Sequence, residues 1–303
     1  MKILKALFLS FLAFILLSFS SSSQEVLPDS LVALTESSKL SKKATGYQKS
    51  AQFFFKANDS VQYKNALQSF NQLPLEDLSD TFKRELVRAH SSFLANSFQH
   101  AIARQFLPKL IDDAREQSDF ESKALFHQLL APHYFYSFQY DSSNFHLDKA
   151  IALYSKLNIT QEIGNVTIKK SGISYAKGDY EIAIKYAYEA IEIFKETGNK
   201  EKLAVAYLQL GNILYFQDDF YQSMQYYELS LSAFKANEND EGIYRALSNI
   251  GLVNLMIHNY KKSISQQLES IQYFTLKNKE LEAKIVCVNK NGVSYDIKWK
   301  SLS

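Results

Sequence analysis

The sequence contains little that would interrupt helices or cross-link the chain. It has 9 glycines and 4 prolines, which are 13 of its 303 residues, about a third of their usual share. This scarcity excludes collagen-like chains, flexible linkers and most all-β folds. The single cysteine, Cys287, excludes an intramolecular disulfide and a zinc site made of several cysteines. Because aromatic residues make up 14% and charged residues only 22%, the chain is not intrinsically disordered. These limits favour a folded, all-α protein.

An excess of charge of one sign is also lacking. Lys and Arg number 34 against 32 Asp and Glu, a net charge of +2. Lys2 and Lys5 lie in a segment that we expect to be removed, which leaves 32 basic and 32 acidic residues. Without a basic excess, we expect neither nucleic acid nor a charged membrane surface as a partner.

The first 23 residues have the layout of a secretory signal peptide. Lys2 and Lys5 precede an uncharged apolar run of 14 residues at positions 6–19, and serines occupy positions 20–23. A membrane-spanning helix needs about 20 apolar residues, so an uncleaved membrane anchor is the less favoured alternative. Residues 24–44 follow as a polar leader. We therefore expect export to a bacterial periplasm or secretion, with no membrane span in the mature chain.

Beyond this leader, the same residue types recur at a period close to 40. Recurring glycines stand at Gly172, Gly211, Gly251 and Gly292; recurring aromatic residues at Tyr140, Tyr180, Phe220 and Tyr260; recurring small residues at Ala150, Ala190, Ser230 and Ser270. Each unit reads as two amphipathic helices with a polar turn between them, as at residues 203–216 and 220–234.

Glycine inside a helix costs about 1 kcal/mol relative to alanine, so the recurring glycines predict close approaches of two helices. We expect the glycine of each first helix to face a small residue of the second. The predicted pairs are Gly172 with Ala183, Gly211 with Ser223 and Gly251 with Ser263.

These recurring residues resemble the pattern of the tetratricopeptide repeat family. That family has a small residue in its first helix, an aromatic residue at the start of its second helix, and two small residues within the second helix. Three units match: Gly172, Tyr180, Ala183 and Ala190; Gly211, Phe220, Ser223 and Ser230; and Gly251, Tyr260, Ser263 and Ser270. The first of these units has one residue fewer between its glycine and its aromatic residue, which we interpret as a shorter turn.

Two departures from the family are informative. The unit here has 40 residues rather than the usual 34 or so, as in the longer-looped variety, and a polar connector that includes Gly198 replaces the proline that often ends the second helix. The resemblance implies an all-α, right-handed superhelical solenoid of antiparallel helix pairs.

The repeat pattern varies in quality along the chain. It is well formed over residues 133–280 and degenerate over residues 45–132, where Tyr63 and Phe98 predict the starts of second helices. Residues 281–303 read as an incomplete last repeat that contains Gly292. We expect the chain to be truncated there; the alternative is a tail that packs as an atypical cap.

Recognisable catalytic chemistry is lacking as well. The six histidines form no metal-ligand spacing, and neither a nucleophile motif nor a phosphate-binding glycine loop occurs. The acidic pairs Asp112-Asp113 and Asp218-Asp219 stand at predicted helix ends, where such residues cap and turn the chain. We therefore expect no enzymatic activity, no cofactor and no metal.

The resemblance implies that the first helices line the concave side of the solenoid. Residues two or three positions before each recurring glycine, or one position after it, tend to face that groove. The polar candidates at these positions are Lys169, Lys170, Gln209, Asn212, Ser248 and Asn249, with Tyr215 one turn beyond Gly211. Asn and Gln can bond a peptide backbone and Lys can hold a carboxylate; the alternative is that these are ordinary solvated positions. The sequence predicts a non-enzymatic scaffold for a protein or peptide partner. The alternative is the truncated ligand-sensing portion of a sensor histidine kinase or transcriptional regulator with such repeats.

Overall fold

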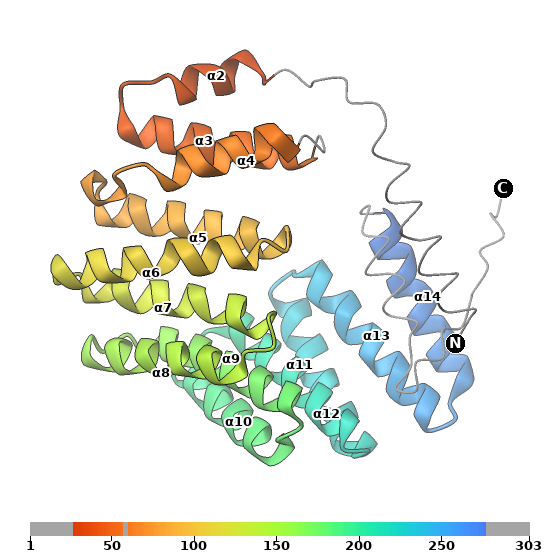
Figure 1. Cartoon of the computed structure of the whole chain (residues 1–303). Coiled ribbons are helices and arrows are strands. Elements are labelled where there is room, and N and C mark those ends of the chain that lie inside the picture. Colours follow the sequence, from red (N-terminus) through yellow and green to blue (C-terminus); the bar gives the residue numbers. More distant parts are fainter. Residues whose placement is uncertain (1–26, 57–59, 277–303) are drawn as a thin grey trace, which may run out of the picture. The chain divides into compact units, whose positions relative to one another are not determined.

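The computed structural model describes residues 27–56 and 60–276, and within these ranges the chain forms helices and no strand. The all-α fold predicted from the sequence is confirmed, and successive helices pack as antiparallel pairs (Figure 1). The predicted signal peptide, Cys287, Gly292 and the predicted incomplete repeat at 281–303 lie outside the described residues.

The described residues fall into two compact units, which are divided between residues 122 and 123. The elements of the first unit are α2 (Asp29–Thr35), α3 (Leu40–Lys56), α4 (Ser60–Asn71), η1 (Leu75–Asp77), α5 (Asp80–Asn96) and α6 (His100–Glu116). Helix α7 (Phe120–Phe135) begins just before the boundary between the units. The elements that follow are α8 (Tyr140–Lys156), α9 (Thr160–Lys177), α10 (Tyr180–Glu196), α11 (Lys200–Phe216), α12 (Phe220–Ala236), α13 (Asp240–Met256) and α14 (Tyr260–Leu276).

From α5 onward, a new helix begins every 20 residues, so that two helices make one 40-residue repeat. Every connection holds one residue with positive φ; these are Phe98, Ser118, Phe138, Asn158, Gly178, Gly198, Asp218, Glu238 and His258. At each of them two backbone hydrogen bonds close the helix end, as when Gly178 N–H donates to the Tyr175 carbonyl (3.0 Å) and Asp179 N–H to the Ser174 carbonyl (2.9 Å). This Schellman pattern satisfies carbonyls that the helix end leaves without partners.

The regular spacing corrects the predicted helix starts in the degenerate part. Phe98 is the left-handed turn residue between α5 and α6, and 81% of its side chain is exposed. Helix α6 begins at His100, so His100 and the fully buried Ala103 stand where the later repeats have Tyr140 and Ser143. Tyr63 does not begin a helix either, because α4 begins at Ser60. At Phe98, a turn residue was mistaken for the aromatic residue that begins a second helix.

The small residues of the repeats connect paired helices through their hydroxyl groups. Ser223 Oγ donates to the Gly211 carbonyl (2.9 Å), and Ser143 Oγ donates to the Ala131 carbonyl (2.8 Å). A Cβ on Gly211 would lie 2.6 Å from the Tyr227 ring, which confirms the close approach predicted there. Two further serines donate in the same way from second to first helices: Ser230 to Ala204 and Ser270 to Tyr244, both 2.9 Å.

The predicted pairing of Gly172 with Ala183 is wrong by one residue. Ser171 occupies the close position, and its Oγ donates to the Ala183 carbonyl over 2.8 Å. Gly172 lies beside it, where an added Cβ would meet only the Gln209 Nε2 atom at 3.9 Å. The turn after α9 is therefore not shortened; a serine has replaced the glycine at the contact, and a glycine has appeared one position later.

Candidate functional site

The first helices of the second unit form a continuous surface. Helix α11 contacts both α9 and α13 directly. Half-buried residues at equivalent positions of these helices follow one another at intervals of 40, and we call this set the first-helix face: Lys169, Gln209 and Asn249, together with Gly172, Asn212 and Leu252.

Two asparagines of this face are hydrogen bonded to each other. Asn249 Nδ2 donates to Asn212 Oδ1 over 2.9 Å, and the same oxygen accepts the Tyr227 hydroxyl over 2.8 Å. Burial raises the pKa of Tyr227, so its hydroxyl keeps its proton and remains a donor. With both lone pairs of Oδ1 used, the amide of Asn212 is held in one orientation. Within the described residues Asn212 Nδ2 donates to no group, so its two hydrogens remain available to a ligand.

The other predicted groove residues lie in the core or between helices. Tyr215 is 4% exposed and belongs to a hydrophobic core cluster with Tyr227, Ile250 and Val253. Ser248 is 2% exposed, and its carbonyl accepts a hydrogen bond from Gln267 Nε2 (3.1 Å). These two positions point into the packing between repeats rather than to the first-helix face.

Lys170 faces the neighbouring second helices. Its ammonium group donates to Asp148 over 2.6 Å and lies 4.7 Å from the centre of the Tyr186 ring. Burial acts to lower the pKa of Lys170, but hydrogen bonds to Asp148 and Tyr186 outweigh this effect and raise it. The equivalent residues Leu210 and Ile250 are buried. Lys170 was placed in the groove only because Gly172, the reference for counting, stands one position late.

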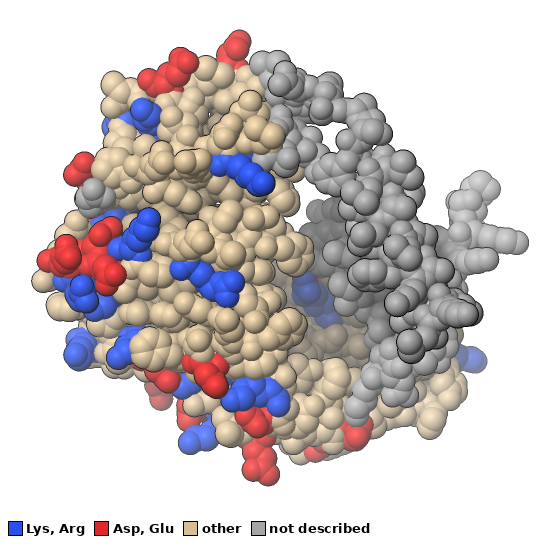
Figure 2. Space-filling model, in the orientation of Figure 1, with Lys and Arg blue, Asp and Glu red and all other residues tan. Residues whose placement is uncertain are grey.

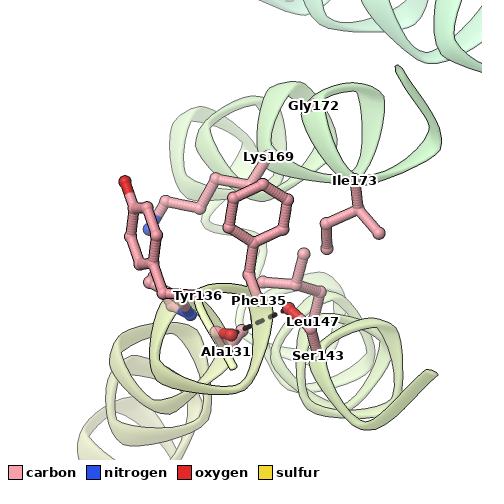
Figure 3. A pocket seen from close by; sticks show the side chains of 9 residues that line it. Ala131, Phe135, Tyr136, Ser143, Leu147, Lys169, Gly172 and Ile173 are labelled. Carbon is pink, nitrogen blue, oxygen red and sulfur yellow. Dashed lines mark hydrogen bonds between the residues drawn. The ribbon is translucent and has the colours of Figure 1, made fainter. Parts of the chain in front are cut away.

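A cavity of about 270 Å³ opens between α7, α8 and α9 (Figure 3). Its floor is formed by buried residues: Ala131, Ser143, Leu147 and Ile173. Pro132 and Phe135 contribute further apolar surface, and Gly172 leaves space that a side chain would fill. The Lys169 side chain extends across the cavity toward the Tyr136 ring.

Comparisons with known proteins agree with this architecture. Residues 163–236 match the family model described as tetratricopeptide repeat. Within these residues the chain carries tetratricopeptide repeats. The matched segment of this tetratricopeptide repeat (TPR) array covers α9 to α12 almost completely. No curated protein sequence shows a significant match to the chain.

Solved structures extend the likeness over most of the chain. The Rap protein complexed with Competence and Sporulation Factor is 13% identical, with a TM-score of 0.63 over 85% of this chain and 72% of that chain. NprR in complex with its cognate peptide NprX is 14% identical, with a TM-score of 0.57 over 91% of this chain and 77% of that chain. A STAND protein with a tetratricopeptide repeat sensor from Pyrococcus horikoshii is 16% identical, with a TM-score of 0.52 over 88% of this chain and 43% of that chain. At such identities, the likeness shows a shared TPR-like fold.

The TPR array also contains a histidine pair that sequence reasoning missed. His127 Nδ1 on α7 and His146 Nδ1 on α8 lie 2.9 Å apart, and His146 stacks on Tyr134 with ring centroids 5.1 Å apart. Burial lowers the pKa of His127 to about 4, with further lowering by the charges of His146, Lys123 and Lys149. At neutral pH one ring donates and the other accepts. The regular helix spacing is the only sequence signal that brings residues 127 and 146 together.

The described part of the TPR array offers neither a metal site nor a membrane span. No group of three or more His, Cys, Asp or Glu residues that could hold a metal ion occurs in it. Among the same residues, no helix combines the length and the apolar character that a bilayer crossing requires. On the face drawn in Figure 2, positive and negative side chains are interspersed, in keeping with the near-zero net charge.

Proposed function

We propose that this chain is a non-enzymatic TPR scaffold that binds an extended protein or peptide segment along its first-helix face. The observation that carries the proposal is the fixed amide of Asn212. An extended segment presents backbone carbonyls at regular intervals, and the Asn212 Nδ2 hydrogens can donate to one of them. Gln209 and Asn249, on either side along the face, add amide groups at repeat intervals.

Two structural neighbours support the proposal because their structures are complexes with a bound partner. The Rap structure is a complex with Competence and Sporulation Factor, and the NprR structure is a complex with its cognate peptide. The shared fold therefore accommodates peptides in at least one of these proteins. The residues that would bind a peptide here are argued from this chain's own first-helix face.

The test is to select peptides from a random display library on the purified chain and to measure their affinity by calorimetry. Asn212→Asp keeps an acceptor for Tyr227 and Asn249 but replaces the outward donor with an oxygen. We expect it to weaken peptide binding roughly tenfold, since one hydrogen bond is lost and an acceptor faces a carbonyl. Gln225→Glu makes the same chemical change at an exposed site of α12 and serves as the control. Equal binding by both variants would refute the role of Asn212.

We also propose that the scaffold is exported, on the basis of the signal-peptide layout of residues 1–23. Cell fractionation followed by N-terminal sequencing of the mature protein tests this. Recovery of the chain outside the cytoplasm, starting within or soon after the serines at 20–23, is the expected result. Recovery of an intact N-terminus inside the cell would contradict it.

A second candidate function is the ligand-sensing portion of a larger signalling protein, either a sensor histidine kinase or a transcriptional regulator. The support is that one neighbour is a STAND protein with a TPR sensor, of which this chain spans 43%. Sequencing the genomic locus beyond codon 303 tests it. A continuing frame that encodes a kinase or DNA-binding region would favour the sensor, and an unrelated gene would favour the scaffold.

A further inference from the structure

The cavity between α7, α8 and α9 is built for apolar contents. Its only buried hydroxyl belongs to Ser143, and that group already donates to the Ala131 carbonyl over 2.8 Å. An apolar group that displaces water there leaves no buried donor without a partner. Its volume of about 270 Å³ is below the range of roughly 300–1,000 Å³ for small-molecule sites. The space therefore suits one large side chain better than a cofactor or a whole small molecule.

The cavity exists because of the residues at one repeat position. Gly172 leaves it open on the α9 side, where an added Cβ would have nothing within 4 Å except Gln209 Nε2 at 3.9 Å. The equivalent residues in the next repeats are Asn212 and Leu252. Asn212 is hydrogen bonded to Tyr227 and Asn249, and a leucine carries its own apolar bulk. Among these three described repeats, only the one with Gly172 leaves this position vacant.

The rim of the cavity carries positive charge. Lys169 is the one charged residue among those that line it, and no carboxylate lines it. The ammonium group extends toward the Tyr136 ring at the mouth (Figure 3). A ligand that enters the cavity therefore meets apolar surface inside and a cation at the edge. An acidic group near the inserted side chain complements that charge.

The cavity and the amides of the first-helix face are adjacent. The Gln209 amide lies beside Gly172, and Asn212 follows one turn along α11. A segment whose backbone follows Gln209, Asn212 and Asn249 therefore passes the mouth of the cavity.

We propose that the cavity receives one large apolar side chain, aromatic or branched aliphatic, of the bound segment, and that Lys169 binds an acidic group on a neighbouring residue of that segment. This inference rests on the proposed peptide-binding function and names the class of ligand. The cavity and its rim fit a peptide segment in which a large apolar residue stands next to an acidic one.

Two substitutions test the proposal, and each introduces the residue that stands at the equivalent position of another repeat. Gly172→Leu introduces the residue found at position 252 and fills the cavity. Lys169→Gln introduces the residue found at position 209 and removes the positive charge. Gly172→Ala is the graded comparison, since it adds a single methyl group and fills only a small part of the cavity. Circular dichroism melts check that each variant is folded, and peptide variants with the apolar residue changed to Ala test the same contact from the ligand side.

The readout is selection from the random-peptide library on the full chain, then calorimetry with the enriched peptides. We expect enriched peptides to share a large apolar residue beside Asp or Glu. Gly172→Leu, or truncation of that peptide residue to Ala, is expected to weaken binding roughly tenfold to a hundredfold. Gly172→Ala, which adds only one methyl group, is expected to weaken binding less than Gly172→Leu. Lys169→Gln is expected to remove the preference for the acidic neighbour.

Three outcomes overturn the proposal. If enriched peptides lack the apolar residue, or bind Gly172→Leu as tightly as the wild type, the cavity is not the anchor although the scaffold function stands. If no peptide is enriched at all, both proposals fall. If the wild type is a dimer in gel filtration and Gly172→Leu a monomer, a second copy of the chain occupies the cavity instead.

Discussion

Asn249 donates a hydrogen bond to the side-chain oxygen of Asn212 over 2.9 Å, although 37 residues separate them in the chain. The two residues belong to neighbouring repeats and lie on the same face of α11 and α13. Because Tyr227 also donates to that oxygen, the direction of the Asn212 amide is set before any ligand arrives. Preorganised donors of this kind reduce the entropy lost on binding.

The two glycines Gly211 and Gly172 are expected to respond oppositely to alanine. A Cβ at Gly211 would lie 2.6 Å from the buried Tyr227 ring, and such overpacking costs about 1–3 kcal/mol. At Gly172 the nearest atom would be 3.9 Å away, so the gain of helix propensity, up to about 1 kcal/mol, is realised. Urea unfolding of both variants measures the difference. Destabilisation of Gly172→Ala would contradict the finding that Ser171, and not Gly172, occupies the close contact between the helices.

Lys170→Leu is expected to raise the free energy of unfolding by roughly 1 kcal/mol. The equivalent residues Leu210 and Ile250 are buried, so a leucine fits this environment. The partner Asp148 is 59% exposed and stays hydrated when it loses the lysine. The control is Lys185→Leu, since Lys185 is exposed and its substitution is expected to change stability by less than about 0.5 kcal/mol. If Lys170→Leu is less stable than the wild type, the ion pair contributes more than apolar burial.

Acid is expected to destabilise the array through His127. In the folded chain the pKa of His127 is about 4, whereas an unfolded histidine titrates near 6.5. Between these values the unfolded state binds the extra proton, so the free energy of unfolding falls as the pH falls from about 6.5 to 4. The loss attributable to His127 is on the order of 2 kcal/mol.

Urea unfolding across this pH range, with the wild type and His127→Gln compared, measures that slope. The variant is expected to show a flatter dependence on pH, because it lacks the group that protonates on unfolding. His258→Gln, at an exposed histidine of a turn, is expected to keep the wild-type slope. Parallel slopes for the wild type and His127→Gln would show that His127 does not cause the loss of stability at acid pH.

Phe138→Gly is expected to stabilise the chain by roughly 0.5–1 kcal/mol. Phe138 has a φ of 59° and a side chain that is 80% exposed. Glycine adopts this left-handed conformation without the penalty of a Cβ, and little buried surface is lost. Thermal unfolding tests this, with Phe145→Gly as the control, since Phe145 is 54% exposed in the middle of α8 and glycine there costs about 1 kcal/mol. A loss of stability for both variants would show that the Phe138 ring contributes more than the turn geometry.

Sequence periodicity predicted the helices well where local signals suffice. Helices α11 and α12 contain the predicted ranges 203–216 and 220–234, because apolar spacing and polar breaks are properties of each segment alone. The turns were harder to recognise. Only Gly178 and Gly198 mark their left-handed positions with glycine, while residues such as Phe98 occupy the others. In those turns the packing of the flanking helices imposes the conformation that the residue itself disfavours.

The sequence by itself determined the helical class, the 40-residue period and the close helix contact at Gly211. Only the tertiary structure decided which side of each helix the recurring residues occupy. One residue along a helix turns a side chain by about 100°, so the replacement of the contact glycine by Ser171 moved Gly172 from the helix contact to the mouth of a cavity. The same rotation directs Lys170 toward Asp148. The register of neighbouring helices is a property of their packing, and it therefore decided which residues form the candidate site.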